Sequence, residues 1–200
     1  MVYLQKTSYT TLAASLINVF LELKVKVLDE EEFFIWHNSA NLPIRASSIY
    51  GVASYAFKKG LNVEVIVEDK EFDFPDYRFY RYTKDDVLLA KKSSSIYLND
   101  CEALGIRVIE RGIDFSFVKS LVLQKKILLL RLNVKSIRGL KKNSSNFLAI
   151  LGFERGNFRV IDPKSGEHFV AESDMIECFS SLETKKHRSH KMIVFNEKSI

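Results

Sequence analysis

The sequence predicts an α+β fold in which a helical part precedes an antiparallel sheet. Two observations carry this prediction. Segments with apolar residues at helical spacing dominate the first half, whereas short apolar runs joined by tight turns dominate the chain after residue 126. A length of 200 residues, of which 46% are hydrophobic and 12% aromatic, suits one globular domain that needs no disulfide bonds.

The first predicted helix covers residues 9–23, where Leu12, Leu16, Val19 and Phe20 recur at helical spacing. We expect Thr10 or Thr11 to cap it, because a threonine hydroxyl can accept a hydrogen bond from a free amide of the first turn. Further helices are expected at 29–37, 44–59, 84–104 and 115–123, with strands at 61–67 and 106–109 and an aromatic connector at 72–82.

The second half changes to strand patterns. Residues 127–132 are a continuous apolar run, typical of a buried strand, and a polar basic loop follows at 133–145. Strands at 146–153 and 157–161 flank a turn that contains Gly156, and a helix at 171–181 and a strand at 192–195 complete the chain. We expect residues 1–182 to form the domain and 183–200 to form a basic C-terminal segment with the last strand and a mobile end.

The formal net charge of +5 is unevenly distributed. Residues 115–145 contain eight lysines and arginines and no acidic residue. Such a stretch can attract nucleic acid or an acidic partner, or it can be a solvated face. The low glutamine content favours a thermophilic organism as the source of the protein.

Other features argue against a membrane, a metal or a cofactor. No apolar run reaches the length of a membrane span, and the first residues do not resemble a signal peptide, so we expect a cytoplasmic protein. Cys101 and Cys178 are interpreted as half-buried small apolar residues, and His187 and His190 lie among positive charges, which disfavours a metal ion. The sequence indicates no oligomeric state.

Two motifs lie near opposite ends of the chain. Gln5 precedes Thr11 by six positions, and Thr11 stands at the start of the first predicted helix. The apolar strand that begins at Asn146 is followed, after the hairpin, by Asp162-Pro163-Lys164-Ser165-Gly166. In this order and spacing the chain resembles the papain-like cysteine peptidases, and among them the bacteriocin-processing peptidases that act on double-glycine leaders, over residues 1–181.

The resemblance implies a papain-like fold, with a central helix packed on a C-terminal antiparallel sheet. It also implies a site in which Gln5 contributes to an oxyanion hole and Asp162 orients a base. Thr11 stands at the position of the catalytic cysteine, Asn146 at that of the histidine, and Leu12 at that of a glycine.

These departures point to lost catalysis. A threonine hydroxyl has a far higher pKa than a thiol and needs a base, and an asparagine cannot take up a proton at physiological pH. We therefore predict a pseudo-peptidase that binds a peptide or protein partner in the former active-site cleft. The aromatic residues Tyr9, Trp36 and Phe147 are candidates to line that cleft, or they belong to the core. Gln5 and Asp162 can also be purely structural, with Asp162 capping its turn.

Two other functions stay open. A hydrolase or acyl transferase would use Thr11 or Ser8 as nucleophile, with His168 as a displaced base. Alternatively, the protein would bind nucleic acid or an acidic partner without sequence specificity through basic residues. The candidate contacts are Lys135, Arg138, Lys141 and Lys142.

Overall fold

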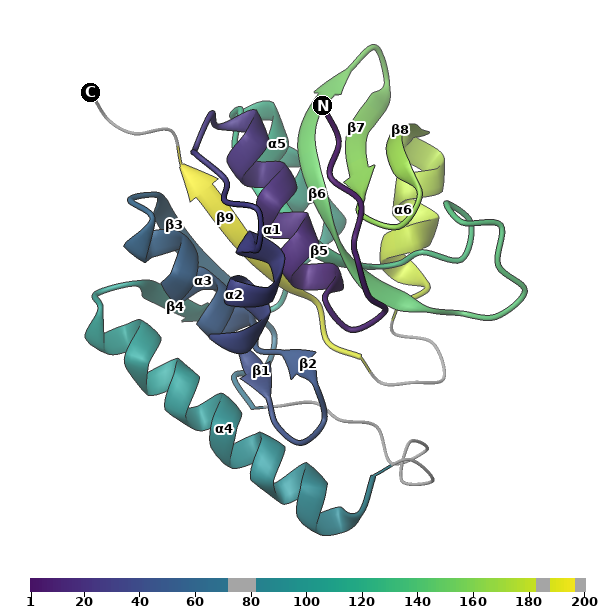
Figure 1. The fold of residues 1–200 in the computed structure, drawn as a ribbon. Helices are drawn as coiled ribbons and strands as arrows, with labels where there is room; N and C mark the ends of the chain where they lie inside the picture. Colours follow the sequence, from purple (N-terminus) through teal and green to yellow (C-terminus); the bar gives the residue numbers. More distant parts are fainter. Residues whose placement is uncertain (72–81, 183–187, 197–200) are drawn as a thin grey trace.

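Residues 1–71, 82–182 and 188–196 are described by the computed structural model of this chain (Figure 1). The helices are α1 Thr11–Glu22, α2 Glu31–His37, α3 Ile49–Lys58, α4 Lys84–Ala103, α5 Phe115–Leu123 and α6 Glu172–Ser180. The strands are β1 Ala40–Asn41, β2 Ala46–Ser47, β3 Asn62–Val67, β4 Arg107–Glu110, β5 Ile127–Asn133, β6 Ser145–Glu154, β7 Asn157–Asp162, β8 Gly166–Ala171 and β9 Lys191–Asn196. The expected connector at 72–82 lies almost wholly outside the described residues.

Seven strands form the central sheet in the order β4-β3-β9-β5-β6-β7-β8. Every neighbouring pair is antiparallel except β3 and β4, which are parallel. This confirms the predicted α+β class. The strands of the first half nevertheless join the same sheet as those of the second half, so the two parts are less segregated than the sequence indicated.

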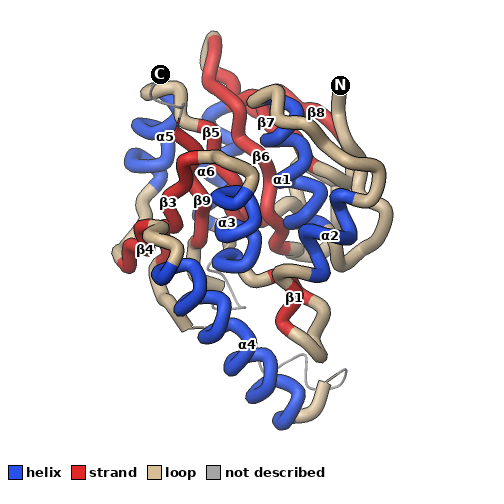
Figure 2. Tube along the Cα trace, turned by 60° about the vertical axis from the view of Figure 1, so that its left-hand side comes forward, coloured by secondary structure: helices blue, strands red, loops and turns tan. Residues whose placement is uncertain are grey.

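Helices cover both faces of this sheet (Figures 1 and 2). Along β5, Leu129 packs into the cluster that includes α1 and α3, whereas Leu128 and Leu130 pack into the cluster that includes α5 and α6. Successive strand residues point to opposite faces, so a strand covered on both sides is apolar throughout. This explains the uninterrupted apolar run that predicted a buried strand at 127–132.

The last strand of the chain lies in the middle of the sheet. β9 pairs with β3 on one side and with β5 on the other, and Ile193 and Phe195 are buried in the α1 cluster. Residues 191–196 are therefore integral to the sheet that residues 1–182 build. The end expected to be mobile, after Asn196, lies outside the described residues.

Two elements were missed by the sequence patterns. The β1–β2 hairpin occupies residues expected to be a loop and the start of a helix, so α3 begins only at Ile49, after Ser48. Strands of two residues are too short to show a period. β8 was not predicted, because as an edge strand it leaves Phe169 exposed and lacks a clear apolar face.

Helix α4 lies along the outside of the molecule and contacts α3, β1 and β4 (Figure 2). Its start carries a capping box in which Thr83 accepts from the Asp86 amide and the Asp86 carboxylate accepts from the Thr83 amide. Among the described helices, none has the length and apolar character needed to cross a membrane.

Candidate functional site

Helix α1 begins beside the start of β6, as the resemblance requires. The Ser15 hydroxyl donates to the Phe147 carbonyl oxygen at 2.8 Å, and Ala13 and Ala14 are fully buried. Thr11 lies one turn before Ser15 on the same side of the helix, so it stands near the start of β6. Its side chain is mostly covered, with 9% of the residue exposed.

The segment before α1 runs past the turn that follows β7. The Gln5 amide donates to the Pro163 carbonyl oxygen at 2.7 Å, which brings the first motif next to the second. The Gln5 side chain donates to the Thr7 carbonyl oxygen at 2.9 Å, while its own oxygen is buried and meets no hydrogen-bond donor among the described residues. Gln5 therefore bonds local backbone and leaves one buried acceptor free.

A buried carboxylate that the sequence analysis did not single out holds this segment in place. Glu32 is fully buried, and it accepts hydrogen bonds from the Tyr3 hydroxyl at 2.9 Å and the Lys6 amide at 2.9 Å. It also accepts from the Thr10 hydroxyl. Burial and the neighbouring Glu32 charge raise the pKa of Tyr3. Thr10 is the N-cap of α1, but its hydroxyl makes no capping bond to the helix amides, contrary to expectation, because it is bound to Thr7 and Glu32.

Asp162 is held by an ion pair. Arg138 Nε donates to Asp162 Oδ2 at 2.6 Å and Arg138 Nη2 donates to Oδ1 at 2.7 Å, with only 8% and 0% of the two side chains exposed. The Lys164 amide and the Ser165 hydroxyl add bonds of 2.9 and 2.8 Å. Burial opposes ionisation of Asp162, but the Arg138 guanidinium and these donors hold its pKa below the usual range. Arg138 was expected among exposed basic residues, and the structure instead uses it inside the site.

Asn146 and Asp162 lie on neighbouring strands. Ala149 pairs with Ile161, so Leu148 stands beside Asp162, and the alternation of β6 puts Asn146 on the face of Leu148. Phe147 and Ala149 belong to the cluster on the α1 face. Within the described part of the chain, no hydrogen bond joins the Asn146 amide to Thr11, Gln5 or Asp162. Asn146 therefore lies on the face of β6 turned away from α1. The four positions lie near the same end of the sheet, but in the described part of the chain their side chains form no connected network.

His168 lies on β8 rather than at Thr11. Its Nε2 is 2.8 Å from the Ser165 hydroxyl oxygen, and that hydroxyl donates its single proton to Asp162. His168 Nε2 must then be the donor to Ser165, so this contact does not prepare the ring nitrogen to remove a proton. No hydrogen bond of the described residues links His168 to Thr11 or to Ser8, which is exposed.

The expected aromatic residues fall into two places. The rings of Tyr9 and Trp36 meet at a centroid distance of 5.1 Å, and the Trp36 indole donates to the Arg45 carbonyl oxygen at 3.0 Å. The Arg45 guanidinium lies 5.8 Å from the Tyr9 ring. Phe147 packs on the α1 cluster with the Arg131 guanidinium 5.8 Å from its ring.

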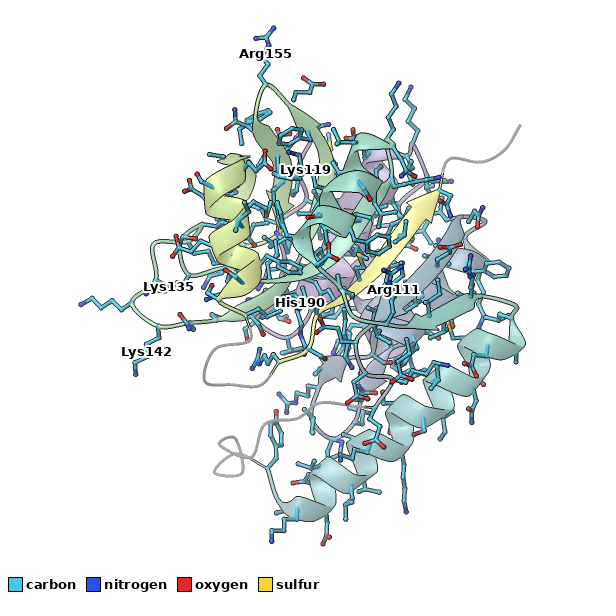
Figure 3. All side chains as sticks on the ribbon, turned by 180° about the vertical axis from the view of Figure 1, so that it is seen from behind. Arg111, Lys119, Lys135, Lys142, Arg155 and His190 are labelled. Carbon is cyan, nitrogen blue, oxygen red and sulfur yellow. The ribbon has the colours of Figure 1, made fainter. Side chains whose placement is uncertain are left out.

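The basic loop between β5 and β6 leaves Lys135, Lys141 and Lys142 exposed. Figure 3 shows Lys135 and Lys142 projecting outward at the margin of the molecule. Arg138 anchors the same loop through its ion pair with Asp162.

A solved structure shares this fold. The chain is similar to a double-glycine-motif protease from an AMS/PCAT transporter, determined in complex with the leader peptide, at 15% identity and a TM-score of 0.50. The similarity covers 98% of this chain and 91% of that chain. The fold is that of a papain-like peptidase. No protein-family model and no curated protein matches the sequence.

Proposed function

We propose that this papain-like domain is catalytically inactive and binds a peptide or protein segment where α1 begins beside β6. The neighbouring structure is a peptidase with a bound leader peptide, which supports a peptide as the class of partner. An extended segment is the kind of ligand that such a site accommodates, because it makes backbone contacts along a strand and places side chains in pockets.

The observation that carries the inactivity is the buried Arg138–Asp162 pair. In a cysteine peptidase the acid orients a histidine through a hydrogen bond. Here the two carboxylate oxygens accept from Arg138, Lys164 and Ser165, so the acid is engaged elsewhere. Thr11 is the candidate nucleophile, Asn146 stands where the resemblance places the base, and no described residue accepts a hydrogen bond from the Thr11 hydroxyl.

The test is a selection of peptides from a random displayed library on the immobilised protein, followed by a binding titration of the selected peptides. The variant Thr11→Trp fills the start of α1 with a large side chain and should lower affinity at least tenfold. Ser173→Trp is the matched control, because Ser173 is exposed in the first turn of another helix, α6, and should leave affinity unchanged. Circular dichroism is used to check that both variants fold.

Equal binding by wild type and Thr11→Trp would reject the proposed location. Binding that appears only below about 50 mM salt and disappears at physiological ionic strength would instead favour a non-specific role of the exposed lysines. Peptide fragments with new termini after incubation would contradict the inactivity.

A further inference from the structure

A second candidate site lies where α2, α3 and α4 meet, away from Thr11 and Asp162. It is a pocket of about 410 Å³, within the range of small-molecule sites. Figure 2 shows the three helices on the same side of the molecule. The residues on which the inference rests are Gly51, Ser54, Tyr55 and Lys58 of α3 and Tyr97 and Asp100 of α4.

At the floor of the pocket, α3 and the segment at Ser39 lie in close contact. A Cβ at Gly51 would lie 2.8 Å from the Ser39 Cα, so only glycine lets the two segments touch here. One turn further, Ser54 is 6% exposed, and its hydroxyl has no hydrogen-bond partner among the described residues. The hydroxyl lies beside the Cys101 thiol, which is only a weak hydrogen-bonding group and leaves most of the capacity of the hydroxyl unused. A buried hydroxyl without a partner costs free energy that a ligand can recover.

Two opposite charges line the pocket without pairing. Lys58 and Asp100 are both exposed, and no ion pair of the described residues joins them to each other or to a third group. The neighbouring Lys59 differs, because its ammonium lies 2.6 Å from the Glu31 carboxylate. Lys58 on α3 and Asp100 on α4 are therefore charges available to a ligand, and the imidazole of His37 also lines the pocket.

Two tyrosines supply ring surface. The Tyr55 hydroxyl donates to Glu31 at 2.7 Å, and the Tyr97 hydroxyl donates to the Ala40 carbonyl oxygen at 3.3 Å. Because both hydroxyls are already engaged, each residue offers mainly its aromatic ring to a ligand.

We propose that this pocket binds a small zwitterion with an aromatic part, of the size and charge of a free aromatic α-amino acid. The carboxylate lies toward Lys58 and the Ser54 hydroxyl, and the ammonium lies toward Asp100. The aromatic part packs against the two tyrosine rings. The ligand thus satisfies the buried hydroxyl and both unpaired charges at once. The site shares no residue with the degenerate peptidase site, so it stands independently of the proposed function.

The test is calorimetric titration with three probes: L-phenylalanine, its amide, which lacks the carboxylate, and N-acetyl-L-phenylalanine, which lacks the ammonium. We expect saturable binding of L-phenylalanine and at least about tenfold weaker binding of both analogues, the effect of one lost charge-assisted contact. Lys58→Ala and Asp100→Asn should each weaken L-phenylalanine binding by a similar factor. Lys91→Ala, an exposed lysine of α4 outside the pocket, should leave it unchanged.

The proposal is overturned if L-phenylalanine shows no saturable binding or if either analogue binds as well as the zwitterion. It is also overturned if Lys91→Ala weakens binding as much as Lys58→Ala does. Both changed pocket charges are at exposed positions, so the variants should keep the fold, and circular dichroism checks this directly.

Discussion

Removal of Arg138 is the most informative perturbation of the site. In Arg138→Ala, the fully buried Asp162 carboxylate keeps only the Lys164 amide and the Ser165 hydroxyl as donors. Removing one partner of a buried ion pair leaves an uncompensated charge and costs about 3–5 kcal/mol. We expect a loss of this size in the free energy of unfolding, measured by urea denaturation followed by circular dichroism.

The pH dependence gives a second readout. The pKa of Asp162 is lower in the folded state than in the unfolded state, where it is about 4. The Arg138–Asp162 pair therefore contributes its full stability above pH 4, and this contribution is lost as the pH falls through the folded-state pKa. In Arg138→Ala, burial dominates and raises the pKa of Asp162, so protonation relieves the buried charge. The stability difference between wild type and variant should therefore narrow from pH 7 to pH 4.

Arg159→Ala is the matched control. Arg159 also binds carboxylates, at 2.7 Å from Glu22 and 2.6 Å from Glu167, but its side chain is 38% exposed. Exposed ion pairs contribute at most about 1 kcal/mol each, so this variant should lose much less stability than Arg138→Ala. A loss below about 1 kcal/mol in Arg138→Ala, or equal losses in the two variants, would refute the reasoning.

Three further predictions concern the core around the two sites. Glu32→Gln should lower the free energy of unfolding, measured by urea denaturation, by about 2–3 kcal/mol, because charged hydrogen bonds to the N-terminal segment are lost. The same change should speed hydrogen exchange of the backbone amides in that segment, and unchanged exchange would contradict this prediction. Gly51→Ala should destabilise the protein by about 1–3 kcal/mol, because the added Cβ collides with Ser39. A neutral effect would mean that α3 and the turn at Ser39 can separate. Cys101 and Cys178 are almost fully buried, and burial raises the pKa of Cys101 to about 11 and also raises the pKa of Cys178. Iodoacetamide at pH 8 should therefore label the two thiols only after the protein unfolds. Fast labelling of the native protein would contradict this burial.

The local parts of the fold followed from the sequence. The apolar spacing of Leu12, Leu16 and Phe20 predicted α1, and the continuous run at 127–132 predicted β5. The turn between β6 and β7 was also correct, since Arg155 and Gly156 both have positive φ angles, of 51° and 80°. These features depend on residues close in the sequence, and such local structure produces a recognisable pattern of apolar and turn residues.

The long-range parts did not follow. Glu32 was not singled out, because nothing near it in sequence indicates that it is buried and bound by Tyr3 and Lys6. Arg138 was grouped with the exposed lysines of its loop, although the fold brings it to Asp162, 24 residues away. Likewise, the central place of β9 depends on pairing with β3, more than a hundred residues earlier. In each case the partner is set by the tertiary fold.

The most direct test of binding without cleavage is a time course by mass spectrometry. The tightest selected peptide is incubated with excess protein at pH 7 to 9, and the masses of both are followed. The account predicts that the peptide keeps its intact mass and that the protein carries no acyl adduct at Thr11. Peptide fragments or an adduct that appear with wild type and vanish in Thr11→Ala would contradict it and would assign a catalytic role to that hydroxyl.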